Sequence, residues 1–86
     1  MNSIYLHLGK NTSVRLSSIV GIFDLDTSSY SQQTRNYLYG AERMGLTVNL
    51  SDDLPKSFVI CEEDGAYTIY ICQLASGTLQ KRMTEG

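Results

Sequence analysis

The side chains that could perform chemistry are few and widely spaced in this chain of 86 residues. His7 is the only histidine, and nucleophilic catalysis would need a nucleophile and a third group arranged around such a base. No pattern in the sequence identifies those partners, so we interpret His7 as a strand residue with ordinary structural contacts. The sequence therefore predicts a protein that is not an enzyme.

Residues that could hold metals or phosphates are equally sparse. Cys61 and Cys72 are eleven positions apart and distant from His7, which does not match the ligand spacing of a zinc site. Asp24 and Asp26 form a D-x-D pair, which we interpret as capping a helix start because no further oxygen-rich loop follows. The stretch "GKNTS" lacks the spacing of a phosphate-binding loop. We expect no metal, no cofactor and no small-molecule substrate.

Basic side chains are the remaining candidates for binding. Arg15 and Lys10 lie near the first predicted turn, Lys56 lies at a strand start, and Lys81 and Arg82 lie near the end of the chain. Each has an alternative interpretation as ordinary solvated surface. The formal charge of −2 argues against an autonomous nucleic-acid binder, although seven basic residues could still gather on one face.

The first half of the chain contains the strands and the helix that would position these side chains. "SIYLHLG" alternates, which predicts a strand with Ile4, Leu6 and Leu8 on its buried side. "VRLSSIVGIFDLD" predicts one bent strand or two short ones, and Gly21 inside the apolar run indicates a bulge or a close backbone approach.

Residues 26–45 predict one amphipathic helix, with N-cap candidates between Asp26 and Ser31 and a left-handed C-cap at Gly45. Gly40 either permits close approach to a strand or a neighbouring subunit, or is simply tolerated. The expected buried stripe is Tyr30, Thr34, Tyr37, Ala41 and Met44, with Leu38 at its edge; Arg35, Tyr39, Glu42 and Arg43 are expected on or near the opposite side. Tyr39 is either incidental there or part of an interface.

The second half begins with "TVNLS", a short strand, and continues with a hairpin that turns at Asp64-Gly65. That turn places Cys61 opposite Thr68 and leaves Cys72 roughly 13 Å away at ~3.3 Å per residue, too far for a disulfide. Both thiols are expected to be reduced and buried. Ser76 or Thr78 is expected to cap a last turn or two of helix.

Together these elements predict an α+β fold: a small single domain over residues 1–86, mainly antiparallel β, with one central amphipathic helix and a short C-terminal helix. "MNSIYLHLGK" does not resemble a signal peptide, and "IVGIF" is far shorter than the roughly 20 residues of a membrane span, so we expect a cytoplasmic protein with no membrane partner. A core without tryptophan and with two phenylalanines would gain from a subunit interface, which suggests a homo-oligomer.

Several stretches, in this order along the chain, carry a family resemblance: "YLHLG", "IVGIFDLD", "DDLPKSFVI" and "TLQKR". With them the chain resembles the RemA/RemB family of extracellular-matrix regulators of Gram-positive bacteria, and the RemB-like branch most closely. The resemblance implies a LytTR-like fold, a ring-shaped homo-oligomer, and a DNA-binding regulator of the transcription of biofilm-matrix genes. Double-stranded DNA is then the expected partner, with Arg15, Lys56, Lys81 and Arg82 as candidate nucleic-acid contacts. The alternative is a non-catalytic oligomeric scaffold or interaction protein that has lost DNA binding.

The sequence departs from the RemA branch where that branch carries arginines. Residues 16–18 read "LSS" and residues 52–54 read "DDL", which implies weak DNA binding per subunit or a different surface. Pro55 is expected to end the loop and let a strand begin at Ser57. Lys56 then either pairs with Asp52 or Asp53 within the loop, or contacts phosphate.

Overall fold

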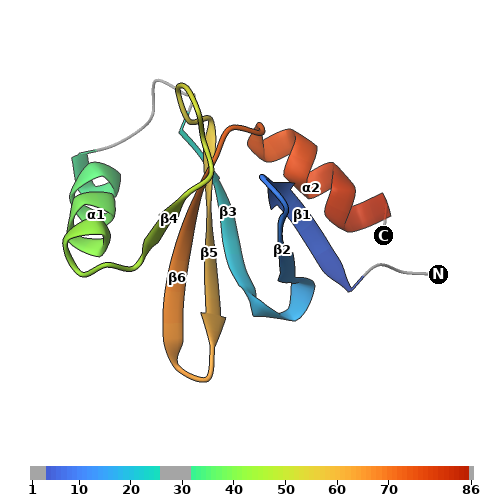
Figure 1. Ribbon diagram of the computed structural model, residues 1–86, viewed down its shortest axis with the longest axis horizontal. Helices are drawn as coiled ribbons and strands as arrows, with labels where there is room; N and C mark the ends of the chain where they lie inside the picture. Colours follow the sequence, from blue (N-terminus) through green and yellow to red (C-terminus); the bar gives the residue numbers. More distant parts are fainter. Residues whose placement is uncertain (1–3, 26–31, 86) are drawn as a thin grey trace.

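The computed structural model describes residues 4–25 and 32–85, which form six strands, two α-helices and one 3₁₀ turn. Three layers stand side by side in Figure 1: α1, then a four-stranded sheet, then the β1–β2 hairpin with α2. The predicted α+β class is confirmed. The elements are β1 (Tyr5–Gly9), β2 (Thr12–Arg15), the 3₁₀ turn (Leu16–Ser18), β3 (Ile19–Asp24), α1 (Gln32–Arg43), β4 (Thr47–Asn49), β5 (Ser57–Glu63), β6 (Ala66–Cys72) and α2 (Ser76–Glu85).

The β1–β2 hairpin turns at Lys10-Asn11, whose φ angles of 47° and 61° are those of a type I′ turn. Leu6 and Leu8 are buried as predicted. Ile4 is 62% exposed, so its predicted burial is wrong, although its carbonyl accepts the Leu16 N–H at 2.9 Å.

The apolar run after the hairpin forms two short strands, β2 and β3, separated by the 3₁₀ turn. Gly21 shows both predicted features. The register with β5 shifts between Ile19 and Gly21, and a Cβ at Gly21 would lie 2.7 Å from the ring of Phe23. That ring stacks on Phe58 with centroids 4.9 Å apart. The glycine therefore lets the ring cover the backbone of its own strand.

The four-stranded sheet has the order β3-β5-β6-β4, antiparallel except for the parallel pair β4–β6. Asp64 and Gly65 make the predicted type I′ turn, with φ angles of 53° and 83°, and Cys61 pairs with Thr68 as expected. Both cysteines are buried free thiols. The central strand β5 is covered on both faces, which explains its nearly continuous apolar sequence.

Helix α1 ends as predicted at Gly45, where φ is 74°. The Gly45 N–H donates to the Glu42 carbonyl and the Leu46 N–H donates to the Ala41 carbonyl, which is a Schellman motif. The N-cap candidates, Asp26 of the D-x-D pair and Tyr30 lie outside the described residues.

The buried face of α1 is narrower than the expected stripe. Ala41 is buried and Leu38 is partly buried against Phe58 and Ile69 of the sheet. Met44 is 74% exposed and Tyr37 is also exposed, so their predicted burial is wrong. Ala41 is the one buried residue among those described in α1, with Leu38 packed beside it, so the helix covers the sheet with a narrow strip.

Helix α2 has ten residues, more than the predicted turn or two. Ala75 accepts its first backbone hydrogen bond, from Leu79, so neither Ser76 nor Thr78 caps it as predicted. Leu79 is fully buried in the main core, and the Ser57 hydroxyl donates to the Leu74 carbonyl at 2.7 Å just before the helix. Docking on the sheet therefore extends a helix that would be marginal alone.

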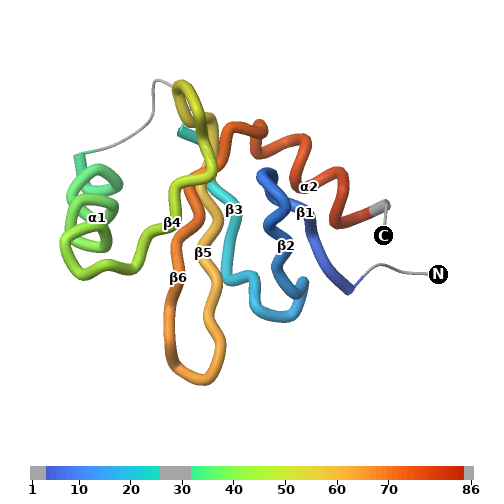
Figure 2. Tube along the Cα trace, viewed as in Figure 1, coloured from blue at the N-terminus to red at the C-terminus, as the bar shows by residue number. Residues whose placement is uncertain are grey.

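The two ends of the chain meet in the third layer. Segments β1 and α2 lie side by side in Figure 2, and their buried leucines share one core with β5 and β6. Within the part of the chain that the structure describes, no helix is long and apolar enough to cross a bilayer.

Candidate functional site

Two of the predicted nucleic-acid contacts lie on α2. Lys81 and Arg82 are exposed, and the Arg82 guanidinium donates to the backbone carbonyl of His7 at 3.2 Å. Lys10, at the turn of the same hairpin, forms an ion pair with Asp52. We call Lys10, Lys81 and Arg82 the basic flank, because the turn after β1 and the adjoining helix carry all three.

Lys56 lies at the mouth of β5, as predicted, and both of its backbone groups join the sheet. Its N–H donates to the Cys72 carbonyl and its carbonyl accepts from the Leu25 N–H, each at 2.9 Å. The alternative of an ion pair with Asp52 or Asp53 is wrong, since Asp52 bonds to Lys10 and Lys56 forms no ion pair with any described residue.

Strand alternation separates Lys56 from the basic flank. The side chain of Ser57 faces the α2 layer, where its hydroxyl meets Leu74, so the preceding side chain points toward the α1 layer with that of Phe58. The basic flank lies in the α2 layer. The structure therefore does not unite Lys56 with Lys81 and Arg82 on one surface.

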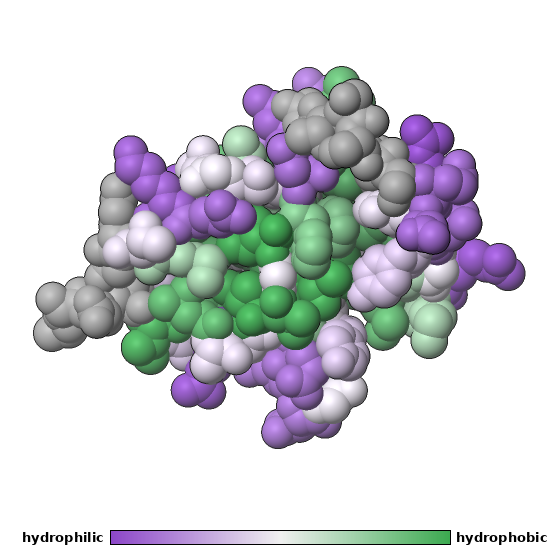
Figure 3. All heavy atoms as spheres, turned by 180° about the vertical axis from the view of Figure 1, so that it is seen from behind, coloured by the Kyte–Doolittle hydropathy of each residue, from purple (hydrophilic) through white to green (hydrophobic). Residues whose placement is uncertain are grey.

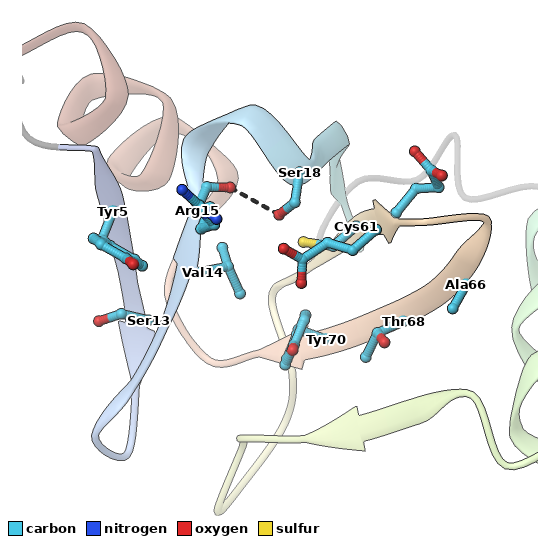
Figure 4. Close-up of a pocket in the computed structure, with 11 residues that line it drawn as sticks. Tyr5, Ser13, Val14, Arg15, Ser18, Cys61, Ala66, Thr68 and Tyr70 are labelled. Carbon is cyan, nitrogen blue, oxygen red and sulfur yellow. Dashed lines mark hydrogen bonds between the residues drawn. The ribbon is translucent and has the colours of Figure 1, made fainter.

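Arg15 lies in a different setting, at the end of β2. It lines a groove of about 340 Å³ between the β1–β2 hairpin and the half of the β5–β6 hairpin that is next to the Asp64-Gly65 turn (Figure 4). Its backbone carbonyl accepts the Ser18 hydroxyl at 2.8 Å. The lining residues are Tyr5, Ser13, Val14, Arg15, Ser18, Cys61, Glu62, Glu63, Ala66, Thr68 and Tyr70.

Negative charge predominates on the side of the groove that the β5–β6 hairpin forms. Glu62 and Glu63 line it, and Asp64 follows at the turn. Glu62, in the wall of this groove, lies six positions after Lys56 along the chain, or roughly 20 Å at ~3.3 Å per residue. The acidic neighbours make Arg15 a poorer phosphate contact than the basic flank, because a phosphate carries no positive group that could pair with the two carboxylates.

The polar groups on the floor of the groove are neutral donors. Burial raises the pKa of the Cys61 thiol, an effect that a hydrogen bond with Ser18 opposes and the charge of Glu63 reinforces. Burial also raises the pKa of Tyr70, and Cys61 and Glu63 add to that shift. At neutral pH both groups are protonated, so each can donate a hydrogen bond.

An uncovered apolar band follows the outer edge of β3. Figure 3, which is the reverse of the view in Figure 1, shows apolar residues gathered in a continuous band. Val20 and Phe23 on β3 are 60% and 43% exposed. Ile60 and Tyr37 line a hollow with Phe23 on one side of the strand. We call Val20, Phe23, Tyr37 and Ile60 the apolar band.

Within the described residues, β3 forms its ladder with β5 alone, so its other edge is unpaired. An apolar unpaired edge is a ready surface for association with another chain. Sequence reasoning identified neither this edge nor the groove. The run "IVGIF" signalled an apolar strand, but strand order was needed to place it at the border of the sheet.

No three described histidine, cysteine or acidic side chains are grouped as a metal site would require. In the comparisons with known proteins, no protein-family model and no curated protein matches the chain.

Proposed function

We propose that the protein is a self-associating, DNA-binding regulator of transcription, acting on biofilm-matrix genes as the family resemblance implies. The observation that carries the proposal is the uncovered apolar band along β3. Burying this band against another copy would repeat the basic flank in every subunit of the assembly.

Repeating the basic flank matters because a single subunit carries few cations that could contact phosphates. Lys81 and Arg82 are exposed, but Lys10 already pairs with Asp52 and the chain carries a net charge of −2. Phosphate contacts from several linked copies add through effective concentration without any new contact in the subunit. Such contacts would position the DNA rather than read its sequence.

The assembly that we propose is a ring. The two edge strands, β3 and β4, are unlike in length and surroundings. Contact between unlike surfaces of successive copies closes into a ring when the rotation per copy allows it. DNA following such a ring pays a bending cost of the order of 1–6 kcal/mol for 40–90° over 20–30 base pairs.

The second candidate is an oligomeric scaffold without DNA binding. Arg15 favours it, because this predicted contact shares its groove with Glu62 and Glu63. The pairing of Lys10 with Asp52 also favours it, since a paired lysine has less charge to offer a phosphate.

Salt titration of duplex binding separates the two candidates. For the regulator, the logarithm of the binding constant falls linearly with the logarithm of salt concentration, on random duplexes and on matrix-promoter duplexes. The Lys81→Ala/Arg82→Ala variant should flatten this slope by about one unit per removed charge while the assembly keeps its mass. Lys56→Ala tests the separate position at the mouth of β5 in the same way.

Arg43→Ala is the matched control, because it removes one exposed cation from α1, in the layer opposite the basic flank. An unchanged slope in the α2 variant would assign Lys81 and Arg82 to ordinary solvated surface. An absence of binding at low salt by an intact assembly would leave the scaffold as the function.

A further inference from the structure

We propose that the groove between the β1–β2 and β5–β6 hairpins binds a small dipolar molecule of the amino-acid class, with Arg15 receiving the carboxylate and Glu63 the ammonium group. This inference does not rest on the proposed function, since it requires neither DNA nor a second subunit.

The two charges come from opposite walls of the groove. Arg15 lies on β2 and is exposed, and Figure 4 draws its side chain on the side of the groove that the β1–β2 hairpin forms. Glu63 lies on β5, two positions after Cys61, so strand alternation puts both side chains on the same face. Glu63 lines the groove together with Cys61 and Tyr70, and its charge contributes to the raised pKa of both groups.

Neither charge is neutralised locally. Arg15 and Glu63 line the same groove, yet neither forms an ion pair with any described residue. Opposite charges that face one space without touching leave room for a ligand that carries the complementary charges at its two ends. A guanidinium binds a carboxylate with two parallel hydrogen bonds, which gives that end its orientation.

The rest of the groove suits the body of such a ligand. The side chains of Tyr5 and Tyr70 lie on opposite sides of it in Figure 4, and Ser13 and Thr68 add hydroxyl groups. The raised pKa values of Cys61 and Tyr70 keep their thiol and hydroxyl protonated, so they do not repel a carboxylate. A volume of about 340 Å³ falls within the ~300–1,000 Å³ range of small-molecule sites.

The test is an amide NMR titration with a series of ω-amino acids: glycine, β-alanine, γ-aminobutyrate and ε-aminohexanoate. Because the two charges have a fixed spacing, one chain length should bind best, with a Kd of the order of 1 mM. Saturable shifts are expected at Ser13, Arg15 and Thr68. Butyrate and butylamine, which carry one charge each, should bind about tenfold more weakly than the best dipolar probe.

Charge variants assign the two ends. Arg15→Gln and Glu63→Gln should each weaken the best probe about tenfold, and the exchange Arg15→Glu/Glu63→Arg should restore most of that loss with the ligand reversed. Arg43→Gln and Glu42→Gln on α1 are the matched controls and should change nothing. The amide spectrum without ligand verifies that each variant folds.

Equal binding of dipolar and singly charged probes would overturn the proposal, as would the absence of any saturable shift at concentrations of the order of 10 mM. The titration needs no DNA, so its failure leaves the regulator proposal intact. Failure of the salt titration likewise leaves this groove untouched.

Discussion

At the scale of single residues, folding raises the pKa of both cysteine thiols. Cys72 is fully buried, and burial raises its pKa to about 11, although a hydrogen bond with Ser57 acts in the opposite direction. Burial likewise raises the pKa of Cys61. In the unfolded chain both thiols would ionise near their ordinary value of 9.0.

These shifts predict a loss of stability at high pH. Below about pH 9 both states hold the thiol protons, and between pH 9 and about 11 the unfolded state releases the Cys72 proton while the folded state keeps it. The free energy of unfolding should therefore fall as pH rises through this range, as measured by urea denaturation at successive pH values. In Cys61→Ala/Cys72→Ala the fall should be shallower. An identical pH profile in that variant would show that other groups cause the loss.

At the scale of elements, the two glycines near the end of α1 have opposite requirements. Beyond the backbone of its own helix, no heavy atom lies within 4 Å of the position that a Cβ at Gly40 would take, so no strand of the described chain approaches it. Of its alternatives, close approach to a strand is wrong, and tolerance or a neighbouring subunit remains. Gly45 has a φ of 74° in the Schellman motif, which strains any residue with a Cβ.

Alanine substitution at these positions should therefore change stability in opposite directions. Gly40→Ala is expected to raise the free energy of unfolding by roughly 0.5–1 kcal/mol, and Gly45→Ala to lower it by roughly 1–2 kcal/mol. Chemical denaturation of the three proteins measures both changes. If Gly40→Ala folds well but lowers the mass of the assembly, the glycine serves a subunit contact.

Helix α2 depends on docking, which Leu79 makes testable. Its side chain is fully buried in the core shared by β1, β5 and β6. Leu79→Ala should cost about 2–5 kcal/mol of unfolding free energy. Gln80→Ala, at the next and exposed position, is the matched control and should stay within about 0.5 kcal/mol of the parent. Equal effects of the two changes would mean that α2 adds little to the core.

At the scale of the whole molecule, the proposed self-association through the apolar band can be tested with a single charge. Val20 lies on the unpaired edge of β3 and is 60% exposed, so a charge there is compatible with folding but not with burial against another copy. Val20→Glu should lower the mass measured by light scattering at matched concentration while circular dichroism stays unchanged. Leu54→Glu is the control, because Leu54 is 78% exposed in a loop. A parent protein that is monomeric at all concentrations tested would remove the ring, and repeated phosphate contacts with it.

Much of the local structure could be predicted from the sequence, because it depends on neighbours along the chain. The Asp64-Gly65 turn, the pairing of Cys61 with Thr68 and the C-cap at Gly45 follow from backbone preferences and fixed spacing. The break at Gly21 and the strand start after Pro55 follow in the same way. These features held because each involves a few residues that are close in sequence.

The burial of helix side chains and the grouping of charges could not be predicted in this way. Met44 lies on the predicted apolar stripe of the helix, as Ala41 does, and only the position of the sheet decides which of the two side chains is buried. Lys56 and Arg15 each lie near a turn or a strand end, but strand order and alternation put them at opposite ends of β5.

By itself, then, the sequence determined the elements, their turns and the α+β class, because backbone preference and apolar period act over short distances. Only the tertiary structure decided that β3 is an edge, that Lys10 pairs with Asp52 and that Arg15 and Glu63 line one groove. These relations join residues far apart in the chain, so they depend on how the layers pack.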